Sequence, residues 1–251
     1  MRSITRSPLQ TPTLLLVAFA LTVAAPRAAA DINNLKGLSQ AEFKLLADDL
    51  VSALSYKAVT PAEPLGITGF DVGVGLTVMQ TQSDAPWKLA SGSGKSFLSV
   101  PRISVQKGLP FDVDVGGFYA TVPGTGIDFF GGEIKYAIVS GSTTLPAVAI
   151  RGAATRLVGL DQLDFESRSL ELTVSKGLLN FTPYAGIGKV WGDVTPDNAA
   201  LLGAVKLKKE SPSATRAFVG LNFNIFLGNL ALEVDKTGEN TGASAKLGIR
   251  F

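Results

Sequence analysis

Residues 242–251 read Gly-Ala-Ser-Ala-Lys-Leu-Gly-Ile-Arg-Phe and place an apolar side chain at every second position up to Phe251. Side chains along a β-strand point alternately to opposite faces. The stretch is therefore predicted to be a strand with two different faces. Its apolar face ends in Phe251, and its polar face carries Lys246 and Arg250. A strand of this kind separates an apolar environment from a polar one.

The same alternation recurs along most of the chain from residue 68 onward. Leu170 and Leu172, for example, alternate with Glu171 and Thr173. Closing such strands into a barrel pairs every backbone group, as the interior of a bilayer requires. The sequence predicts an all-β protein, a closed antiparallel transmembrane β-barrel of ten strands, with eight or twelve as alternatives because residues 199–205 can hold a further strand. The strands are expected at about 68–80, 97–106, 110–121, 127–139, 146–157, 164–176, 180–192, 213–226, 229–236 and 242–251.

The connections between these strands fall into two sets that alternate along the chain. One set is mostly tight, and the other contains the two long connections, 81–96 and 193–212. Outer-membrane barrels have short periplasmic turns and longer outer loops. The alternation therefore predicts that the barrel begins and ends on the periplasmic side.

The terminal strand resembles the C-terminal signature of Gram-negative outer-membrane β-barrels, among them small barrels of the OmpA and OmpW type, because its apolar alternation closes on the aromatic Phe251. This resemblance implies a location in the outer membrane, in contact with membrane lipid and lipopolysaccharide. It also implies that the barrel-assembly machinery reads the terminal strand through Phe251. It implies an insertion route and no particular activity.

The first 30 residues have the pattern of a signal peptide. Arg2 and Arg6 precede an uncharged apolar run over residues 14–25, and three alanines follow at 28–30. A positive start, a short apolar run and a small-residue cleavage site define such a peptide. The run is shorter than the roughly 20 residues of a membrane-spanning helix. We expect residues 1–30 to be removed, residues 31–66 to form a helix and a Pro-containing linker, and residues 67–251 to form the barrel.

An amphipathic helix is predicted over about 40–55. Ser39 and Glu42 form the S-x-x-E capping box that begins many helices. The helix is expected to plug the barrel or cap its periplasmic mouth, because glycines at inward strand positions leave room for another group. The alternatives are a helix lying on the inner leaflet surface or docked to a periplasmic partner. The expected apolar face is Phe43, Leu46, Leu50 and Leu54, and the glycines are Gly73, Gly75, Gly116, Gly131 and Gly248.

Charged side chains occur mainly on the strand face opposite to the apolar one. A charge that faces lipid at the bilayer midplane costs about 2–4 kcal/mol, so these charges are expected to point inward. Carboxylates and basic groups around the ring are expected to form an internal salt-bridge network. Its predicted members are Arg102, Asp112, Asp114, Glu133, Lys135, Arg151, Glu171, Glu233, Lys246 and Arg250.

Composition argues against several classes of function. The chain has no histidine. The outer-membrane barrels that act as proteases, phospholipases or deacylases use a histidine as the base, so their chemistry is not expected here. Removal of the signal peptide takes away three arginines and leaves 20 basic against 21 acidic residues, a net charge of −1. This gives no electrostatic case for nucleic acid. No cofactor is expected, and Asp71, Asp235 and Glu239 lack the spacing of a calcium loop, so no metal is expected either.

Two functions remain. The first is a non-enzymatic barrel with a structural role or an interaction role for its outer loops, in which Trp87 and the basic segment 206–209 contact lipopolysaccharide phosphates or a partner. The second is a narrow channel for small or apolar solutes. Its apolar vestibule would be formed by inward residues near the outer rim, namely Leu98, Val100, Ile127 and Phe129.

Overall fold

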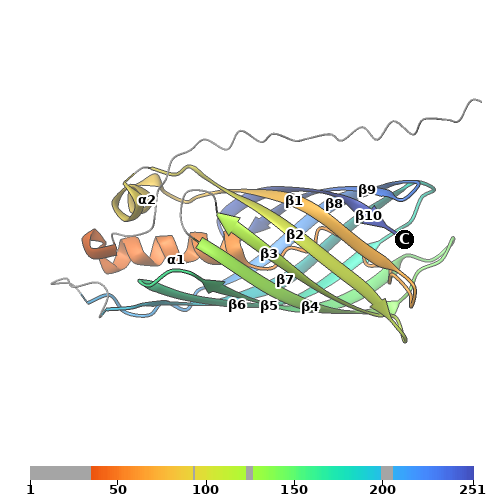
Figure 1. The fold of residues 1–251 in the computed structure, drawn as a ribbon, viewed down its shortest axis with the longest axis horizontal. Helices are drawn as coiled ribbons and strands as arrows, with labels where there is room; N and C mark the ends of the chain where they lie inside the picture. The colour runs from red at the N-terminus through yellow and green to blue at the C-terminus, as the bar shows by residue number, and fades with distance from the viewer. Residues whose placement is uncertain (1–34, 93, 123–126, 199–205) are drawn as a thin grey trace, which may run out of the picture.

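The computed structural model describes residues 35–92, 94–122, 127–198 and 206–251 (Figure 1). For Val122 and Ile127 it describes the main chain alone. The predicted signal peptide and the segment 199–205, which was considered for a further strand, lie outside the described residues. Among the described residues, no helix has both the length and the apolarity to cross a bilayer.

Ten antiparallel strands form one closed barrel, as the sequence predicts, and each strand pairs with its neighbours in the chain. The first strand pairs with the last, from Asp71 opposite Arg250 to Met79 opposite Gly242. The strands are β1 (Phe70–Gln80), β2 (Phe97–Leu109), β3 (Val113–Val122), β4 (Ile127–Val139), β5 (Ala147–Val158), β6 (Leu163–Ser175), β7 (Phe181–Pro196), β8 (Ser213–Ile225), β9 (Gly228–Thr237) and β10 (Asn240–Arg250).

The two ends of the barrel differ in their connections. At one end lie the turns 110–112, 140–146, 176–180 and 226–227, together with the terminal Phe251. At the other end lie the connections 81–96, 159–162, 197–212 and 238–239. The ends are called here the turn end and the loop end. The main-chain N–H of Phe251 donates to the carbonyl of Phe70, and that of Phe70 donates to the carbonyl of Phe251, so the chain terminus is fixed to the start of β1.

Three short helical elements precede the barrel or connect its strands. The 3₁₀ turn η1 (Leu35–Gly37) and the helix α1 (Gln40–Leu54) come before β1, and α2 (Asp84–Ser91) lies in the connection between β1 and β2. The predicted capping box is confirmed, because Ser39 and Glu42 satisfy each other's main-chain N–H groups. The helix α2 was not predicted, although Ser83 caps its start and Gly92 ends it in the left-handed region.

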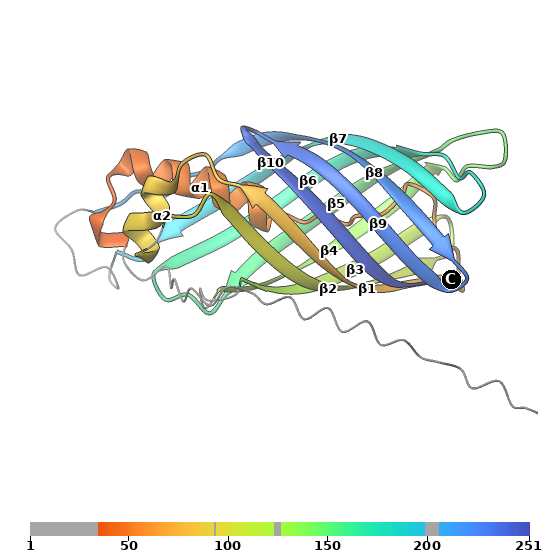
Figure 2. The same cartoon turned by 90° about the horizontal axis from the view of Figure 1, so that it is seen from above.

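Both helices lie at the loop end, whereas the C-terminus lies at the turn end (Figures 1 and 2). The inner end of α1 enters the barrel, and the chain then continues between the strands toward the turn end, where β1 starts. The expectation that α1 caps the same mouth as the chain terminus is therefore wrong. The residues before β1 reach the turn end by passing through the ring of strands.

Candidate functional site: the interior of the barrel

The apolar face of α1 is buried against inward-facing strand residues. Phe43, Leu46, Leu50 and Leu54 are each at most 1% exposed. Their spacings of three and four residues place them along one side of the helix, which turns once every 3.6 residues. Together they form one continuous core with strand residues that include Met79, Leu98, Val100, Phe129, Phe165, Val190 and Val194.

The residues considered for an apolar vestibule belong to this core. Leu98, Val100 and Phe129 are at most 4% exposed and lie in the same cluster as the helix face. The side chain of Ile127 is outside the described part of the structure. Burial of an apolar side chain stabilises by roughly 1.5–3 kcal/mol relative to exposure. The described vestibule residues therefore hold α1 in place instead of lining an open mouth.

A polar contact fixes α1 to α2 and to the barrel rim. The Asp49 carboxylate accepts hydrogen bonds from Trp87 Nε1 at 2.8 Å, Asn240 Nδ2 at 2.7 Å and the main-chain N–H of Gln82 at 3.0 Å. Burial raises the pKa of Asp49, and these three donors oppose that rise. Asp49 lies off the apolar stripe, and its 1% exposure was not foreseen because its partners come from distant parts of the chain.

Trp87 and the segment 206–209 were expected to face outward from the loops. Trp87 is 1% exposed because its ring packs in the core beneath α2, so that expectation is wrong for Trp87. Lys206 and Lys208 are exposed, whereas Leu207 is buried. The ammonium of Lys209 lies 2.9 Å from an oxygen of Asp193.

The segment after α1 is held inside the barrel by inward side chains along its length. Residues 55–62 are all buried. The Lys57 ammonium lies 2.8 Å from Asp235 Oδ2, and neither side chain is exposed. Farther along, Arg151 donates to the Thr60 hydroxyl at 3.0 Å, and the main-chain N–H of Leu65 donates to Asp114 at 3.1 Å. The segment is thus bound through charges and hydrogen bonds, in contrast to the apolar docking of α1.

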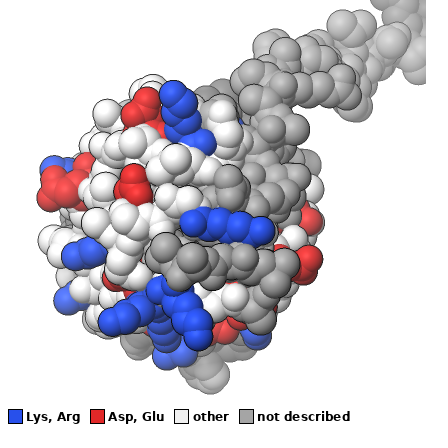
Figure 3. Space-filling view, turned by 90° about the vertical axis from the view of Figure 1, so that its left-hand side faces the viewer, with Lys and Arg blue, Asp and Glu red and all other residues white. Residues whose placement is uncertain are grey.

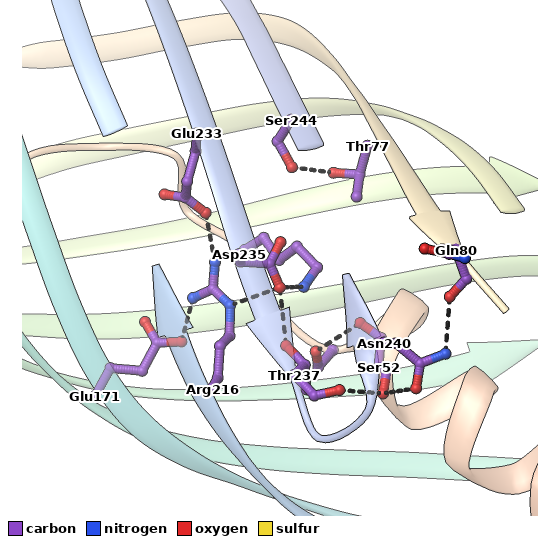
Figure 4. A network of polar contacts seen from close by, with 12 residues as sticks. Ser52, Thr77, Gln80, Glu171, Arg216, Glu233, Asp235, Thr237, Asn240 and Ser244 are labelled. Atoms are coloured by element: carbon purple, nitrogen blue, oxygen red, sulfur yellow. Dashed lines mark hydrogen bonds and ion pairs between the residues drawn. The ribbon is translucent and has the colours of Figure 1, made fainter. Parts of the chain in front are cut away.

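Arg216, a residue absent from the predicted network, is the centre of the largest charge cluster. Figure 4 shows its guanidinium, which comes from β8, directed at Glu171 on β6 and at Glu233 and Asp235 on β9. Its nitrogens lie 2.5 Å from Glu171 Oε1 and 3.5 Å from Asp235 Oδ2, and another contacts Glu233. Buried charges are tolerated when each has such partners. Because Asp235 also binds Lys57, the cluster connects the barrel wall to the threaded segment.

Most of the predicted network members lie in the interior, and Arg151 extends the Arg216 cluster because both arginines contact Glu171. Arg151 lies 2.7 Å from Glu133 and 3.2 Å from Glu171. Three further pairings complete the set: Lys135 with Asp114 at 2.8 Å, Lys246 with Asp71 at 2.8 Å, and Arg250 with Asp71 at 3.9 Å. The sequence pattern assigned the face of each residue, but pairing depends on the tilt and stagger of the strands, which the pattern does not contain.

Two predicted members differ from expectation. Asp112 lies outside the interior, because Phe111 and Asp112 adopt φ of 65° and 58° in the turn between β2 and β3. Asp112 there accepts a hydrogen bond from the Ser140 hydroxyl at 2.9 Å. Arg102 is buried, but it donates to the Lys57 carbonyl at 2.9 Å and to the Thr77 hydroxyl at 3.0 Å, and it lies over the ring of Phe118.

The glycines that were expected to make room for the helix face other groups. A methyl group added at Gly73 would meet β10, and one added at Gly116 would meet Gln106 and Glu133. The close approach to α1 is instead at Gly192, where an added Cβ would lie 2.2 Å from Val51 Cγ2. Only glycine fits this contact without a shift of the helix or the strand.

The exterior is apolar around the middle of the barrel. Along β1, β4, β6 and β9, the outward residues Val74, Ile134, Leu170 and Val234 are each about half exposed. The outward aromatic residues Tyr119, Tyr136 and Trp191 are 51%, 49% and 43% exposed. An apolar belt with aromatic residues near its edges, around an interior that holds charges, is the arrangement of a membrane-spanning barrel.

Two of the carboxylates considered for calcium are ion-paired inside the barrel. Asp71 and Asp235, which were considered for calcium, each contact a lysine ammonium at 2.8 Å. In the part of the chain that the structure describes, no group of three or more histidine, cysteine, aspartate or glutamate side chains is placed to hold a metal ion. The described contacts are those of a packed and ion-paired interior.

Comparison with known proteins finds no matching protein-family model and no matching curated protein. Solved structures with a similar arrangement include the outer membrane protein OprG from Pseudomonas aeruginosa, with 10% identity over 76% of this chain and 99% of that chain and a TM-score of 0.37. The N-terminal β-barrel domain of Pseudomonas aeruginosa OprF has 13% identity over 72% and 97%, with a TM-score of 0.35. The attachment invasion locus protein Ail of Yersinia pestis has 14% identity over 73% and 99%, with a TM-score of 0.33.

These identities and TM-scores transfer no function to the chain. The fold itself is established by the ring of ten strands, the pairing of β1 with β10, the apolar exterior and the buried charges inside. The chain therefore folds as a small closed β-barrel with the apolar exterior and charged interior of a membrane-spanning barrel.

Proposed function

We propose that the protein is a non-enzymatic outer-membrane barrel whose lumen is plugged by its own helix α1 and by the segment 55–65. The continuous core between the apolar face of α1 and the inward strand residues is the observation that carries the proposal. Ten strands enclose slightly more space than eight, which side chains alone fill. A helix and an ion-paired segment occupy this additional space.

The orientation of the plug follows from the connections. Longer loops of such barrels face the outside of the cell, so the loop end with α1 and α2 is the outer end. The chain then enters the barrel from outside and reaches β1 at the periplasmic turn end. Phe251 lies at that same turn end, where the terminal strand is available to the barrel-assembly machinery.

The role that this arrangement supports is structural or mediated by the outer end. Figure 3 views the loop end directly and shows lysine and arginine side chains grouped across it, with acidic side chains between them. Exposed basic residues of this end include Lys36, Lys44, Lys88 and Lys208. They suit contact with anionic groups at the outer surface, such as lipopolysaccharide phosphates. The alternative of a narrow solute channel has no supporting observation among the described residues, since the vestibule positions are packed.

Conductance of the purified protein in planar bilayers tests the plug. The full-length barrel is expected to show near-zero conductance, and a variant without residues 35–65 is expected to conduct. Circular dichroism and the heat-dependent shift in gel mobility establish that both barrels are folded. Steady conductance of the full-length protein at the level of the variant would show that α1 does not close the lumen.

A further inference from the structure

A groove of about 350 Å³ crosses the outer wall of the barrel over β4, β5 and β6. Its floor is formed by small residues, because Gly132 pairs with Ala154 in the strand register and both face outward. Phe130 and the charged residues Arg156, Glu166 and Arg168 also line it. Elsewhere on the exterior, large outward side chains such as Ile134 cover the strands. The groove is therefore a local depression in the lipid-facing surface.

The groove lies where the apolar belt ends on the loop side. On β6, the outward residue Leu170 is 49% exposed and belongs to the apolar belt. The next two outward positions toward the loop end are Arg168 and Glu166. On β5 the same change occurs between Ile150 and Arg156. A membrane-spanning barrel meets lipid headgroups at this boundary. A lipid seated here has its chains beside the belt and its headgroup beside the arginines.

The two arginines are placed to converge on one anion. Arg156 is opposite Glu166, and Ala154 is opposite Arg168, so the arginines are diagonal neighbours on adjacent strands. Such neighbours lie about 7–8 Å apart, within the reach of two long side chains. A guanidinium matches the oxygens of a phosphate with paired N–H donors.

The nearby acidic groups leave positive charge available. Arg156 Nε lies 3.6 Å from Glu166 Oε1, but both side chains are largely exposed, and such surface pairs are weak. Arg168 is opposite Trp191 on β7, and Lys189 lies over the Trp191 ring. Asp193 interacts electrostatically with Arg168, and it is in contact with the ammonium of Lys209. The groove is therefore lined by two guanidinium groups, with Glu166 as its acidic lining residue.

We propose that this groove binds a phosphorylated, acylated glycolipid of the outer leaflet, with its phosphate between Arg156 and Arg168 and an acyl chain over Gly132 and Ala154. The inference rests on the proposed function for its orientation, since the loop end must face outward. It assigns a lipid class and a site on the barrel wall, separate from the loops and from the plug.

Binding of bisphosphorylated lipid A to the purified full-length barrel in detergent, followed by native mass spectrometry, tests the site. Arg156→Gln with Arg168→Gln is expected to weaken binding about a hundredfold, at about tenfold for each charged contact, which corresponds to about 1.4 kcal/mol each. Gly132→Leu keeps both charges and fills the groove. Its added Cβ would meet only the Gly116 carbonyl at 3.5 Å, so the barrel is expected to fold and to bind lipid A at least tenfold more weakly. The matched control is Lys236→Gln, which removes an outward basic residue from β9 and leaves binding unchanged.

Two outcomes overturn the site: lipid A affinity of the arginine variant within threefold of the control, or equally tight binding of phosphatidylglycerol. Orientation is checked separately by labelling Lys88→Cys on intact cells with a membrane-impermeant maleimide. Absence of labelling overturns the proposed orientation and this inference with it. Labelling combined with unchanged lipid affinity in both variants overturns the lipid site alone and leaves the proposed function standing.

Discussion

Replacing Lys57 by methionine tests how firmly the threaded segment is bound to the barrel. The variant keeps the length of the side chain and removes a charge that lies 2.8 Å from Asp235 Oδ2 in the interior. Loss of one partner from a buried ion pair costs about 3–5 kcal/mol, because the other charge is left uncompensated. Asp235 retains the Thr237 hydroxyl at 2.8 Å and Arg216 Nε at 3.5 Å. We therefore expect a loss at the lower end of that range, about 3 kcal/mol.

The assay is equilibrium unfolding by urea of the protein in lipid vesicles, followed by tryptophan fluorescence. A double-mutant cycle of Lys57→Met with Asp235→Asn isolates the interaction, and a coupling energy above about 1 kcal/mol is expected. Lys44→Met is the matched control, since Lys44 is an exposed lysine of α1 and its loss should change stability by at most about 0.5 kcal/mol. If Lys57→Met behaves like Lys44→Met and the coupling energy is near zero, the segment is not held inside the barrel by this pair.

Three further variants test other contacts of the interior. Gly192→Val places atoms where Val51 packs and should cost about 1–3 kcal/mol of unfolding free energy, with partial recovery in the double variant with Val51→Ala; no recovery would contradict the contact. Arg216→Met should cost about 3–5 kcal/mol, because it leaves three carboxylates with too few cations, and an unchanged urea midpoint would contradict its central place. Burial raises the pKa of Asp49 above 3.8, so its stabilisation relative to Asp49→Asn is complete below pH 3.8 and is lost as the pH rises through the raised pKa. Undocking of α1 in the native protein and in Asp49→Asn, monitored by Trp87 fluorescence at each pH, measures this stabilisation. A stabilisation that increases with pH would contradict the raised pKa of Asp49.

The barrel itself follows from local sequence patterns. Alternation along the strands assigns an inward or outward face to each residue, and it correctly predicts ten strands whose charged residues such as Glu171 and Lys135 point inward. The capping box at Ser39 marks the start of α1 within one residue. These features are predictable because each depends on neighbours only a few positions away.

The path of the N-terminal segment does not follow from such patterns. Residues 55–65 read as a linker, because they contain two prolines and have no regular apolar spacing. Their burial depends on groups from six strands, for example Asp235 on β9 and Arg151 on β5. The central place of Arg216 in the charge cluster could not be predicted either. Alternation along the strand predicts that Arg216 points inward, but it does not predict which residues Arg216 contacts. The helix α2 had a local signal in Ser83 and Gly92.

A disulfide between α1 and β7 tests the occupied interior most directly. The chain contains no cysteine, so Val51→Cys with Gly192→Cys introduces the only pair. The Val51 Cβ lies 3.3 Å from the Cβ position of residue 192, close to the usual disulfide range of about 3.5–4.5 Å. In outer membranes from intact cells, this pair is expected to oxidise nearly completely and to shift the gel mobility of the folded protein. The control pair Val51→Cys with Ser175→Cys, whose second position is a buried residue at the turn end of β6, should remain reduced. A reduced Val51–Gly192 pair in folded protein would contradict the account, as would equal oxidation of both pairs.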